Sequence, residues 1–290
     1  MLYDRPNHPV NEDDILAFEK EFDIRSLFYV ARYMGILSSI GGRIFFLYFC
    51  LTFIPLTLVC ALSVIILAPF TPDRFSSKLR MFAFFWGRIG TLLSFSPVTI
   101  LHKEKAIDSA AVLISNHQSP FDILVGLGHY PEEFLFFSKK EVFDIPFVGL
   151  AMKKLGYISV DRANARKAAT SLITAVNKIK TGERVLIYPE GTRSHDAFSI
   201  LKFKAGTLVV ASRGQIPIQP IVIFGSQRVK PMKKKYFMRP HKIKIEILDP
   251  IDVSHELHPG NDSSKLSDQE KLEQLRQLVV DSHNRLAASA

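Results

Sequence analysis

The chain has 290 residues, and its 47% share of hydrophobic residues can bury a sizeable core, so disorder is not the default expectation. Its two cysteines, Cys50 and Cys60, lie in one apolar stretch and therefore exclude a disulfide framework. A formal net charge of +9 favours an anionic partner, such as a phospholipid surface, a phosphorylated substrate or nucleic acid.

Residues 1–43 are expected to form a polar or amphipathic N-terminal arm. Residues 1–23 carry several acids and lack the apolar core that precedes the cleavage site of a signal peptide. We therefore expect this arm to be retained rather than cleaved.

Residues 44–97 are expected to form helices embedded in a membrane or lying at its interface. Residues 44–70 carry no charge and can cross a bilayer, which needs about 20 apolar residues. Pro55 and Pro69 complicate a straight span, because proline removes a helical hydrogen bond. Arg88 lies within a second apolar stretch, residues 81–100, and favours an interfacial or protein-packed helix there. We expect a membrane-associated helical hairpin that dips into one leaflet; a single transmembrane span and a buried core helix are the alternatives.

Short β-rich runs alternate with helical patterns from residue 98 to residue 250. This alternation predicts an α/β fold in which helices flank a mixed central sheet. Strands are expected at residues 98–101, 111–115, 156–160, 185–188, 218–223 and 242–248, and helices at residues 122–127, 163–180 and 205–212.

Residues 251–290 are expected to form a linker and one amphipathic helix. Ser267 followed by Glu270 resembles a capping box, and an apolar stripe at helical spacing comes after it. The stripe consists of Leu272, Leu275, Val279 and Leu286.

A histidine and an aspartate follow the strand expected at residues 111–115. Ser119 suits the N-cap of the next helix and Pro120 its first position, so His117 stays in the loop and Asp122 can fold back onto its ring. A carboxylate on one ring nitrogen fixes the tautomer and leaves the other nitrogen free to take a proton from a hydroxyl. Taken alone, the pair is better explained as a capped helix beside an ordinary loop histidine.

Two further strand ends supply side chains that suit a phosphorylated alcohol. Glu190 can accept hydrogen bonds from substrate hydroxyls, and Arg193 offers a planar fork for phosphate. Arg162 follows the strand expected at residues 156–160. Each arginine taken singly is more often a surface ion-pair partner, but a base and two anion binders at three strand ends predict a phosphate-containing substrate.

Four sequence blocks closely resemble those of the glycerolipid acyltransferase family, which includes 1-acylglycerol-3-phosphate acyltransferases. Residues 116–122 match its NHxxxxD block, and residues 188–194 match its FPEGTRS block, with Tyr188 in place of the usual phenylalanine. Residues 156–162 and 216–221 resemble the two other blocks, in the family's order.

The resemblance implies a role for each matching residue. His117 would deprotonate the acceptor hydroxyl, and Asp122 would orient its ring. Backbone amides near the start of the Asp122 helix are candidate donors to the oxyanion that develops during attack on the thioester. An acyl-enzyme on Ser119 is conceivable, but we prefer direct transfer because Ser119 is expected to cap the helix. The residues implied in substrate binding are Asn116, Arg162, Glu190, Gly191, Thr192, Arg193 and Lys204.

These features predict a membrane-bound O-acyltransferase that acylates lysophosphatidic acid to phosphatidic acid. Acyl-CoA or acyl carrier protein (acyl-ACP) would be the co-substrate. No bound cofactor or metal is expected, because the nine histidines lack a paired ligand spacing. Another acceptor, such as lysophosphatidylglycerol or lysocardiolipin, and a non-catalytic lipid-binding protein are the alternatives. The expected location is the cytoplasmic face of a bacterial inner membrane or an endoplasmic-reticulum-type membrane.

Residues 197–245 contain eleven lysines and arginines and no acid, including the run Lys233, Lys234 and Lys235. Such a face would lie against anionic lipid headgroups or attract an acyl carrier, either coenzyme A or an acidic carrier protein. A solvated loop with no dedicated partner is an equal alternative. Nucleic-acid binding is not expected, because the cluster lacks the interleaved aromatic residues of a base-stacking surface.

Overall fold

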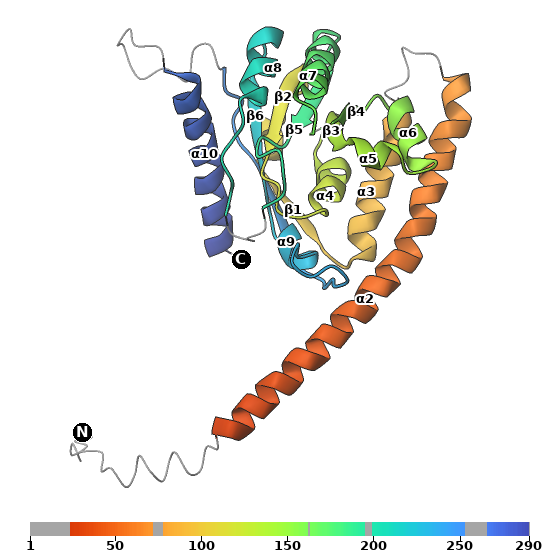
Figure 1. Ribbon diagram of the computed structural model, residues 1–290, viewed down its shortest axis with the longest axis vertical. Helices are drawn as coiled ribbons and strands as arrows, with labels where there is room; N and C mark the ends of the chain where they lie inside the picture. The colour runs from red at the N-terminus through yellow and green to blue at the C-terminus, as the bar shows by residue number, and fades with distance from the viewer. Residues whose placement is uncertain (1–23, 72–77, 162, 195–198, 253–265, 290) are drawn as a thin grey trace, which may run out of the picture.

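In the computed structural model, a seven-stranded sheet lies between layers of helices (Figure 1). The described residues are 24–71, 78–161, 163–194, 199–252 and 266–289, with side chains from Leu37 onward except that of Ala165. The strands are β1 (Val98–Leu101), β2 (Ala111–Ser115), β3 (Leu135–Lys139), β4 (Ile158–Val160), β5 (Arg184–Ile187), β6 (Ile218–Phe224) and β7 (Ile243–Ile247). Their order across the sheet is β1-β7-β6-β2-β5-β3-β4.

The sheet is mixed, as the sequence predicts. β6 pairs antiparallel with β7, and the other neighbouring strands pair in parallel. The six expected strands are all present. β3 was not expected, because its apolar run ends after Phe137 and is too short to distinguish from a helix segment or a loop.

Helices cover both faces of the sheet, and those expected near residues 122, 163 and 205 are confirmed with slightly different ends. α7 contacts β4 and β5, α8 contacts β2, and α10 contacts β6. Figure 1 shows α3 and α4 on the other side of the sheet from α10. The helices after the hairpin are η3 (Lys103–Lys105), α4 (Asp122–His129), α5 (Lys140–Phe143), α6 (Val148–Lys154), α7 (Ala165–Lys180), α8 (Gly206–Gly214), α9 (Ser226–Val229) and α10 (Asp268–Ala288).

Two apolar helices form the expected N-terminal hairpin. α2 spans Ile24–Leu67 and is followed by the short η1 (Ala68–Phe70), while α3 spans Met81–Leu93. The helices pack together through Trp86, whose ring centroid lies 5.1 Å from that of Phe53 and whose Nε1 donates to Thr57 at 2.8 Å. α2 continues through residue 43, where the boundary between arm and hairpin was expected. Residues 1–23 of the expected arm lie outside the described residues.

The hairpin presents a large apolar surface away from the sheet. Residues 37–70 are long and apolar enough to cross a membrane. An exposed apolar surface of this kind marks a membrane or a protein contact. Exposed apolar side chains on the two helices include Ile44, Leu47, Leu51, Ile54, Leu62, Phe84, Phe85 and Leu92.

A backbone contact between α3 and α4 fixes the helix that carries Asp122. A Cβ atom added at Gly87 of α3 would lie 2.5 Å from the carbonyl oxygen of Leu124 and 2.6 Å from the nitrogen of Gly128. Only glycine allows the two helices to approach this closely. α4 is therefore held against the hairpin by main-chain contact.

A polar network beside this contact explains the arginine in the apolar stretch. Arg88 of α3 donates to Nδ1 of His129 on α4 at 2.7 Å, and Nε2 of His129 lies 2.8 Å from Oγ1 of Thr91. Burial first, and then the charge of Arg88, lowers the pKa of His129 to about 4, so its ring is neutral at pH 7. The stretch thus includes a helix packed on protein.

The C-terminal helix α10 is amphipathic, as the sequence predicts. The capping box is confirmed, since the hydroxyl of Ser267 accepts the amide of Glu270 and the carboxylate of Glu270 accepts the amide of Ser267. The four residues of the apolar stripe are buried. The stripe also includes His283, which is 1% exposed and reaches the loop after β2.

Candidate active site

Three neighbouring parallel strands place polar side chains at one edge of the sheet. His117 follows β2, Glu190 follows β5 and Ser226 follows β6. β2 lies between β5 and β6, so the three loops meet there. The carboxyl ends of strands in open α/β sheets are the usual place for ligand sites.

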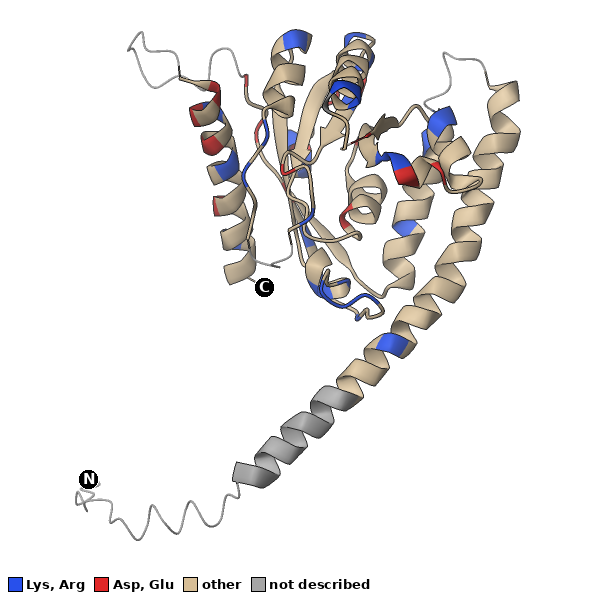
Figure 2. Cartoon of the chain, viewed as in Figure 1, with Lys and Arg blue, Asp and Glu red and all other residues tan. Residues whose placement is uncertain are grey.

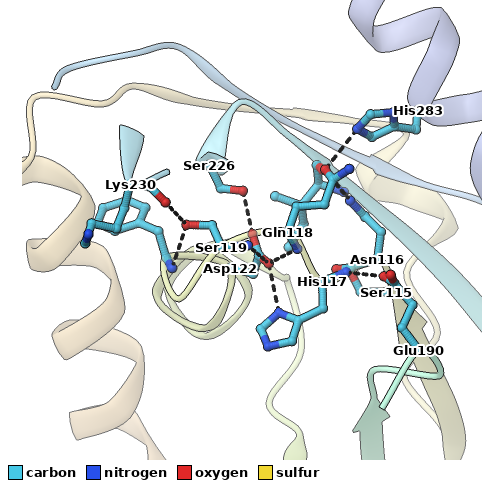
Figure 3. Close-up of polar contacts among 12 residues, drawn as sticks. Ser115, Asn116, His117, Gln118, Ser119, Asp122, Glu190, Ser226, Lys230 and His283 are labelled. Atoms are coloured by element: carbon cyan, nitrogen blue, oxygen red, sulfur yellow. Dashed lines mark hydrogen bonds and ion pairs between the residues drawn. The ribbon is translucent and has the colours of Figure 1, made fainter. Parts of the chain in front are cut away.

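His117 and Asp122 form the expected pair (Figure 3). Nδ1 of His117 lies 2.9 Å from Oδ2 of Asp122, which is completely buried. The carboxylate therefore fixes the hydrogen on Nδ1 and leaves Nε2 as a lone-pair acceptor. Figure 3 draws no contact to the other ring nitrogen, Nε2, and no hydrogen bond to it is found among the described residues.

Further donors hold the Asp122 carboxylate in place. The amides of Gln118 and Ser119 both donate to Oδ2 at 2.9 Å, and the hydroxyl of Ser226 donates to Oδ1. With the bond from His117, four hydrogen bonds satisfy this buried carboxylate and fix its orientation. Ser226 had not been predicted; it follows Gly225 at the end of β6, and no motif marks it.

Four backbone amides between Gln118 and Asp122 already have hydrogen-bond partners. The amides of Gln118 and Ser119 bond Asp122, the amide of Phe121 donates to Oγ of Ser119, and the amide of Asp122 donates to the carbonyl of Ser119. Pro120 has no amide hydrogen. These four amides are therefore not available to an oxyanion, and an oxyanion donor further along the first turn of α4 stays a prediction.

Ser119 is not the N-cap residue, because α4 begins at Asp122 with Phe121 in the cap position. Its buried hydroxyl accepts the amide of Phe121 at 3.1 Å and donates to the carbonyl of Lys230 at 2.9 Å. The Ser119 hydroxyl ties the loop of His117 to the loop after α9. This occupied hydroxyl is a poor nucleophile.

Tyr188 and Glu190 position the His117 loop from β5. The Tyr188 ring stacks on the His117 ring with centroids 4.0 Å apart. The Glu190 carboxylate accepts the amide of His117 at 2.7 Å and the amide of Leu201 at 2.9 Å. Burial raises the pKa of Glu190 to about 7. The structure therefore places Glu190, at 2% exposure, in contacts with the protein backbone.

Asn116 is also held by the protein backbone. Its amide exchanges two hydrogen bonds of 2.9 Å with the backbone of Ile223 on β6, and its Nδ2 donates to Oε1 of Gln118 at 3.2 Å. Gln118 in turn accepts from His283 at 3.0 Å. Sequence reasoning did not foresee the roles of Gln118 and His283, although His283 falls on the apolar stripe of α10.

The remaining predicted binding residues lie in the loop after β5 and beyond it. Gly191 has a φ of +69°. The Lys204 side chain packs over this glycine, since a Cβ atom added at position 191 would lie 2.8 Å from Nζ of Lys204. Thr192 is exposed and Arg193 is half-buried. Burial lowers the pKa of Lys230, and the charge of Arg193 lowers it further. Arg162 lies outside the described residues.

An apolar cavity of about 220 Å³ lies between the hairpin and the α/β domain. Trp86 of α3, Ile123 and Leu127 of α4 and Met152 of α6 contribute to its lining. Ile123 is the neighbour of Asp122 in the chain, so the same helix carries the carboxylate and one wall of the cavity.

An imidazole that a buried carboxylate orients, with cationic side chains in the neighbouring loop, is typical of enzymes that activate a hydroxyl. Residues 97–224, which include all four sequence blocks, match the family model described as Acyltransferase. This match agrees with the family resemblance of the four sequence blocks.

Two similar proteins carry names that agree with this family. A 1-acyl-sn-glycerol-3-phosphate acyltransferase of Helicobacter pylori is 32% identical over 154 residues, which are 52% of this chain and 65% of that protein. A chloroplastic 1-acyl-sn-glycerol-3-phosphate acyltransferase of Arabidopsis thaliana is 32% identical over 187 residues, which are 63% of this chain and 51% of that protein. The chain thus spans about half to two thirds of these relatives.

The fold also matches a solved structure. The crystal structure of the 1-acyl-sn-glycerophosphate acyltransferase of Thermotoga maritima superposes with a TM-score of 0.70 at 25% identity. The match covers 86% of this chain and 97% of that one. It therefore extends beyond residues 97–224 to most of the chain.

Proposed function

We propose that this chain transfers a fatty acyl group from an acyl thioester to the free hydroxyl of lysophosphatidic acid and forms phosphatidic acid. The proposal rests on the His117–Asp122 pair, whose open Nε2 suits it as a general base. The names of the similar proteins, 1-acyl-sn-glycerol-3-phosphate acyltransferases, support the choice of acceptor.

The proposed reaction is a direct transfer. Nε2 of His117 takes the proton as the acceptor oxygen forms a bond to the thioester carbonyl carbon. The tetrahedral intermediate then collapses, the carbon–sulfur bond breaks, and the imidazolium returns the proton to the thiolate. Asp122 stabilises the transient imidazolium. The occupied hydroxyl of Ser119 supports this route over an acyl-enzyme.

Cationic side chains are the proposed anion binders. Arg193 and Lys204 lie in the loops next to Glu190, and we assign them to the phosphate and to the developing oxyanion. Thr192 and Gly191 belong to the same loop, and Arg162 stays a predicted phosphate ligand. Asn116 and Glu190 would act by holding the loops in place.

The apolar hairpin is the proposed membrane attachment. Its exposed apolar side chains would lie in one leaflet, and the cavity of about 220 Å³ beside it would hold part of an acyl chain. We propose acyl-CoA or an acyl carrier protein as donor. The four segments 1–43, 44–97, 98–250 and 251–290 remain our proposed domain division. The proposed location is a bacterial inner membrane, at its cytoplasmic face, or an endoplasmic-reticulum-type membrane.

An acyl-transfer assay with His117→Ala tests the proposal. The full-length protein in vesicles would receive an acyl-CoA and a panel of lysophosphatidic acid, lysophosphatidylglycerol and lysocardiolipin. We expect phosphatidic acid from the unchanged protein, and about 10²- to 10⁴-fold slower turnover from the variant, the range typical of a general base. Turnover that survives the substitution would remove His117 from the mechanism. Preference for another acceptor would replace lysophosphatidic acid, and failure to consume any acyl thioester would favour a lipid-binding protein.

A further inference from the structure

A basic cleft lies where the loop after α9 meets helix α2. Its volume is about 530 Å³, and its lining includes Arg43 of α2 and the three consecutive lysines Lys233, Lys234 and Lys235. The other lining residues are Ser39, Tyr236 and Phe237, so the lining contains four cations and no acid. We propose that this cleft docks the anionic headgroups of bilayer phospholipids.

The loop is fixed on α2 by tight contacts. The amide of Met238 donates to the carbonyl of Gly42 at 3.0 Å, and the ring of Phe237 occupies the space where a side chain at position 42 would lie. The Tyr236 ring lies 5.9 Å from that of Phe46. The cleft is therefore a shaped surface between two elements.

Lys230 organises the backbone of the same loop. Its Nζ donates to the carbonyls of Lys234 and Lys235 at 2.8 and 2.7 Å. The ammonium groups of Lys234 and Lys235 lie over the rings of Phe237 and Tyr236, 4.5 and 5.1 Å from the ring centroids. Aromatic rings thus hold two ammonium groups in place in the cleft.

Apolar side chains next to the cleft favour a lipid as its ligand. Ile40, Ile44 and Leu47 of α2 flank Arg43 in the sequence and are exposed. Figure 2 shows the blue loop beside α2, at the end of the domain where this helix extends away from it. An anion in the cleft would thus have apolar helix surface within reach of its tails, as at a membrane interface. Coenzyme A without its acyl chain has no apolar tail to place on that surface, so it serves as the competing ligand in the test.

The cleft is also linked to the His117–Asp122 pair. The hydroxyl of Ser119 donates to the carbonyl of Lys230, and Ser226 of α9 bonds Asp122. Docking of headgroups would therefore hold the site at the membrane surface, and this last step rests on the proposed function. The binding of headgroups in the cleft does not rest on the proposed function, because it can be measured without acyl transfer.

Titration with short-chain lipids tests the cleft. The full-length protein in nonionic detergent would be titrated with dioctanoyl phosphatidylglycerol, dioctanoyl phosphatidylcholine, coenzyme A and inorganic phosphate. The triple variant Lys233→Ala, Lys234→Ala, Lys235→Ala is expected to bind phosphatidylglycerol about 100-fold more weakly, at about fivefold for each charge. The weak binding of phosphatidylcholine should not change.

A second triple variant provides the control for net charge. Arg166→Ala, Lys180→Ala and Arg213→Ala remove three exposed cations on α7 and α8 and should leave phosphatidylglycerol binding within twofold, as estimated from screening of distant charges. An equal loss in both triples would overturn the proposal, and so would unchanged binding in the first. Loss of coenzyme A binding with phosphatidylglycerol binding intact would assign the cleft to the donor instead, and equal binding of inorganic phosphate would deny a lipid site. Melting curves of both variants would show that each is folded.

Discussion

Nε2 of His283 lies 3.0 Å from Oε1 of Gln118, so the C-terminal helix α10 contacts the loop that carries His117. The amide of Asn116 is fixed in orientation by its two bonds to Ile223, and its Nδ2 donates to Oε1 of Gln118. An oxygen of Gln118 therefore faces both donors, and His283 must carry its hydrogen on Nε2. A helix outside residues 97–224 thus helps to position the loop.

His283→Ala is expected to lower kcat about tenfold, because the buried Gln118 loses a donor and its loop becomes less ordered. His283→Gln keeps an amide donor and should recover much of the loss. Gln277→Ala, on the exposed face of α10, is the control. Steady-state kinetics with acyl-CoA and lysophosphatidic acid would separate kcat from KM. An unchanged kcat beside a lower melting temperature would show that His283 only stabilises the fold.

Ser226→Ala tests the other support of the carboxylate. The variant leaves Oδ1 of Asp122 without its hydroxyl donor in a fully buried position, and a hydrogen bond to a charged group contributes about 1.5–3 kcal/mol. We expect kcat to fall by about tenfold or more. Ser171→Ala is a matched control, since this buried hydroxyl bonds Ser159 far from the pair along the chain. Equal activity in the two variants would argue against a positioning role for Ser226.

The site was predictable where its residues follow strands in sequence, and not where they meet through the fold. The spacing of His117 and Asp122, five residues apart after an apolar strand, allowed their contact, and the family's sequence blocks were needed to prefer it over an ordinary capped helix. Ser226 follows a different strand and carries no motif. The donors to Asp122 from Gln118 and Ser119 are backbone amides, which have no side-chain signature. His283 could have been suspected, because a polar residue on an otherwise apolar helical stripe needs a buried partner.

Glu190 predicts a pH dependence of stability. Burial raises its pKa from about 4.5 to about 7, so the folded protein binds this proton more tightly than the unfolded chain does. Its contribution to the free energy of unfolding is fully present below pH 4.5 and is lost as the pH rises through 7. The loss is on the order of 3.5 kcal/mol, since a change of one in pKa corresponds to about 1.4 kcal/mol.

Denaturant unfolding of the protein and of Glu190→Gln, between pH 4.5 and 8, would measure this effect. Other titrating groups are common to both proteins and cancel in the difference. The stability of the unchanged protein relative to the variant should fall with rising pH by a few kcal/mol. A difference that stays constant across this range would contradict the raised pKa of Glu190.

Gly128→Ala should loosen the hairpin from the helix that carries Asp122. The added methyl would overlap the backbone of Gly87 and Arg88, and α3 and α4 can relieve the clash only by moving apart. Overpacking of this kind costs about 1–3 kcal/mol, so we expect a lower melting temperature and slower acyl transfer. Gly126→Ala in the same helix is the control, because its methyl would meet only a Phe134 ring carbon at 3.4 Å. Alanine also favours helix more than glycine does. Gly126→Ala should therefore melt at or above the temperature of the unchanged protein, and equal destabilisation by both substitutions would mean that the close contact between α3 and α4 is not what holds α4 in place.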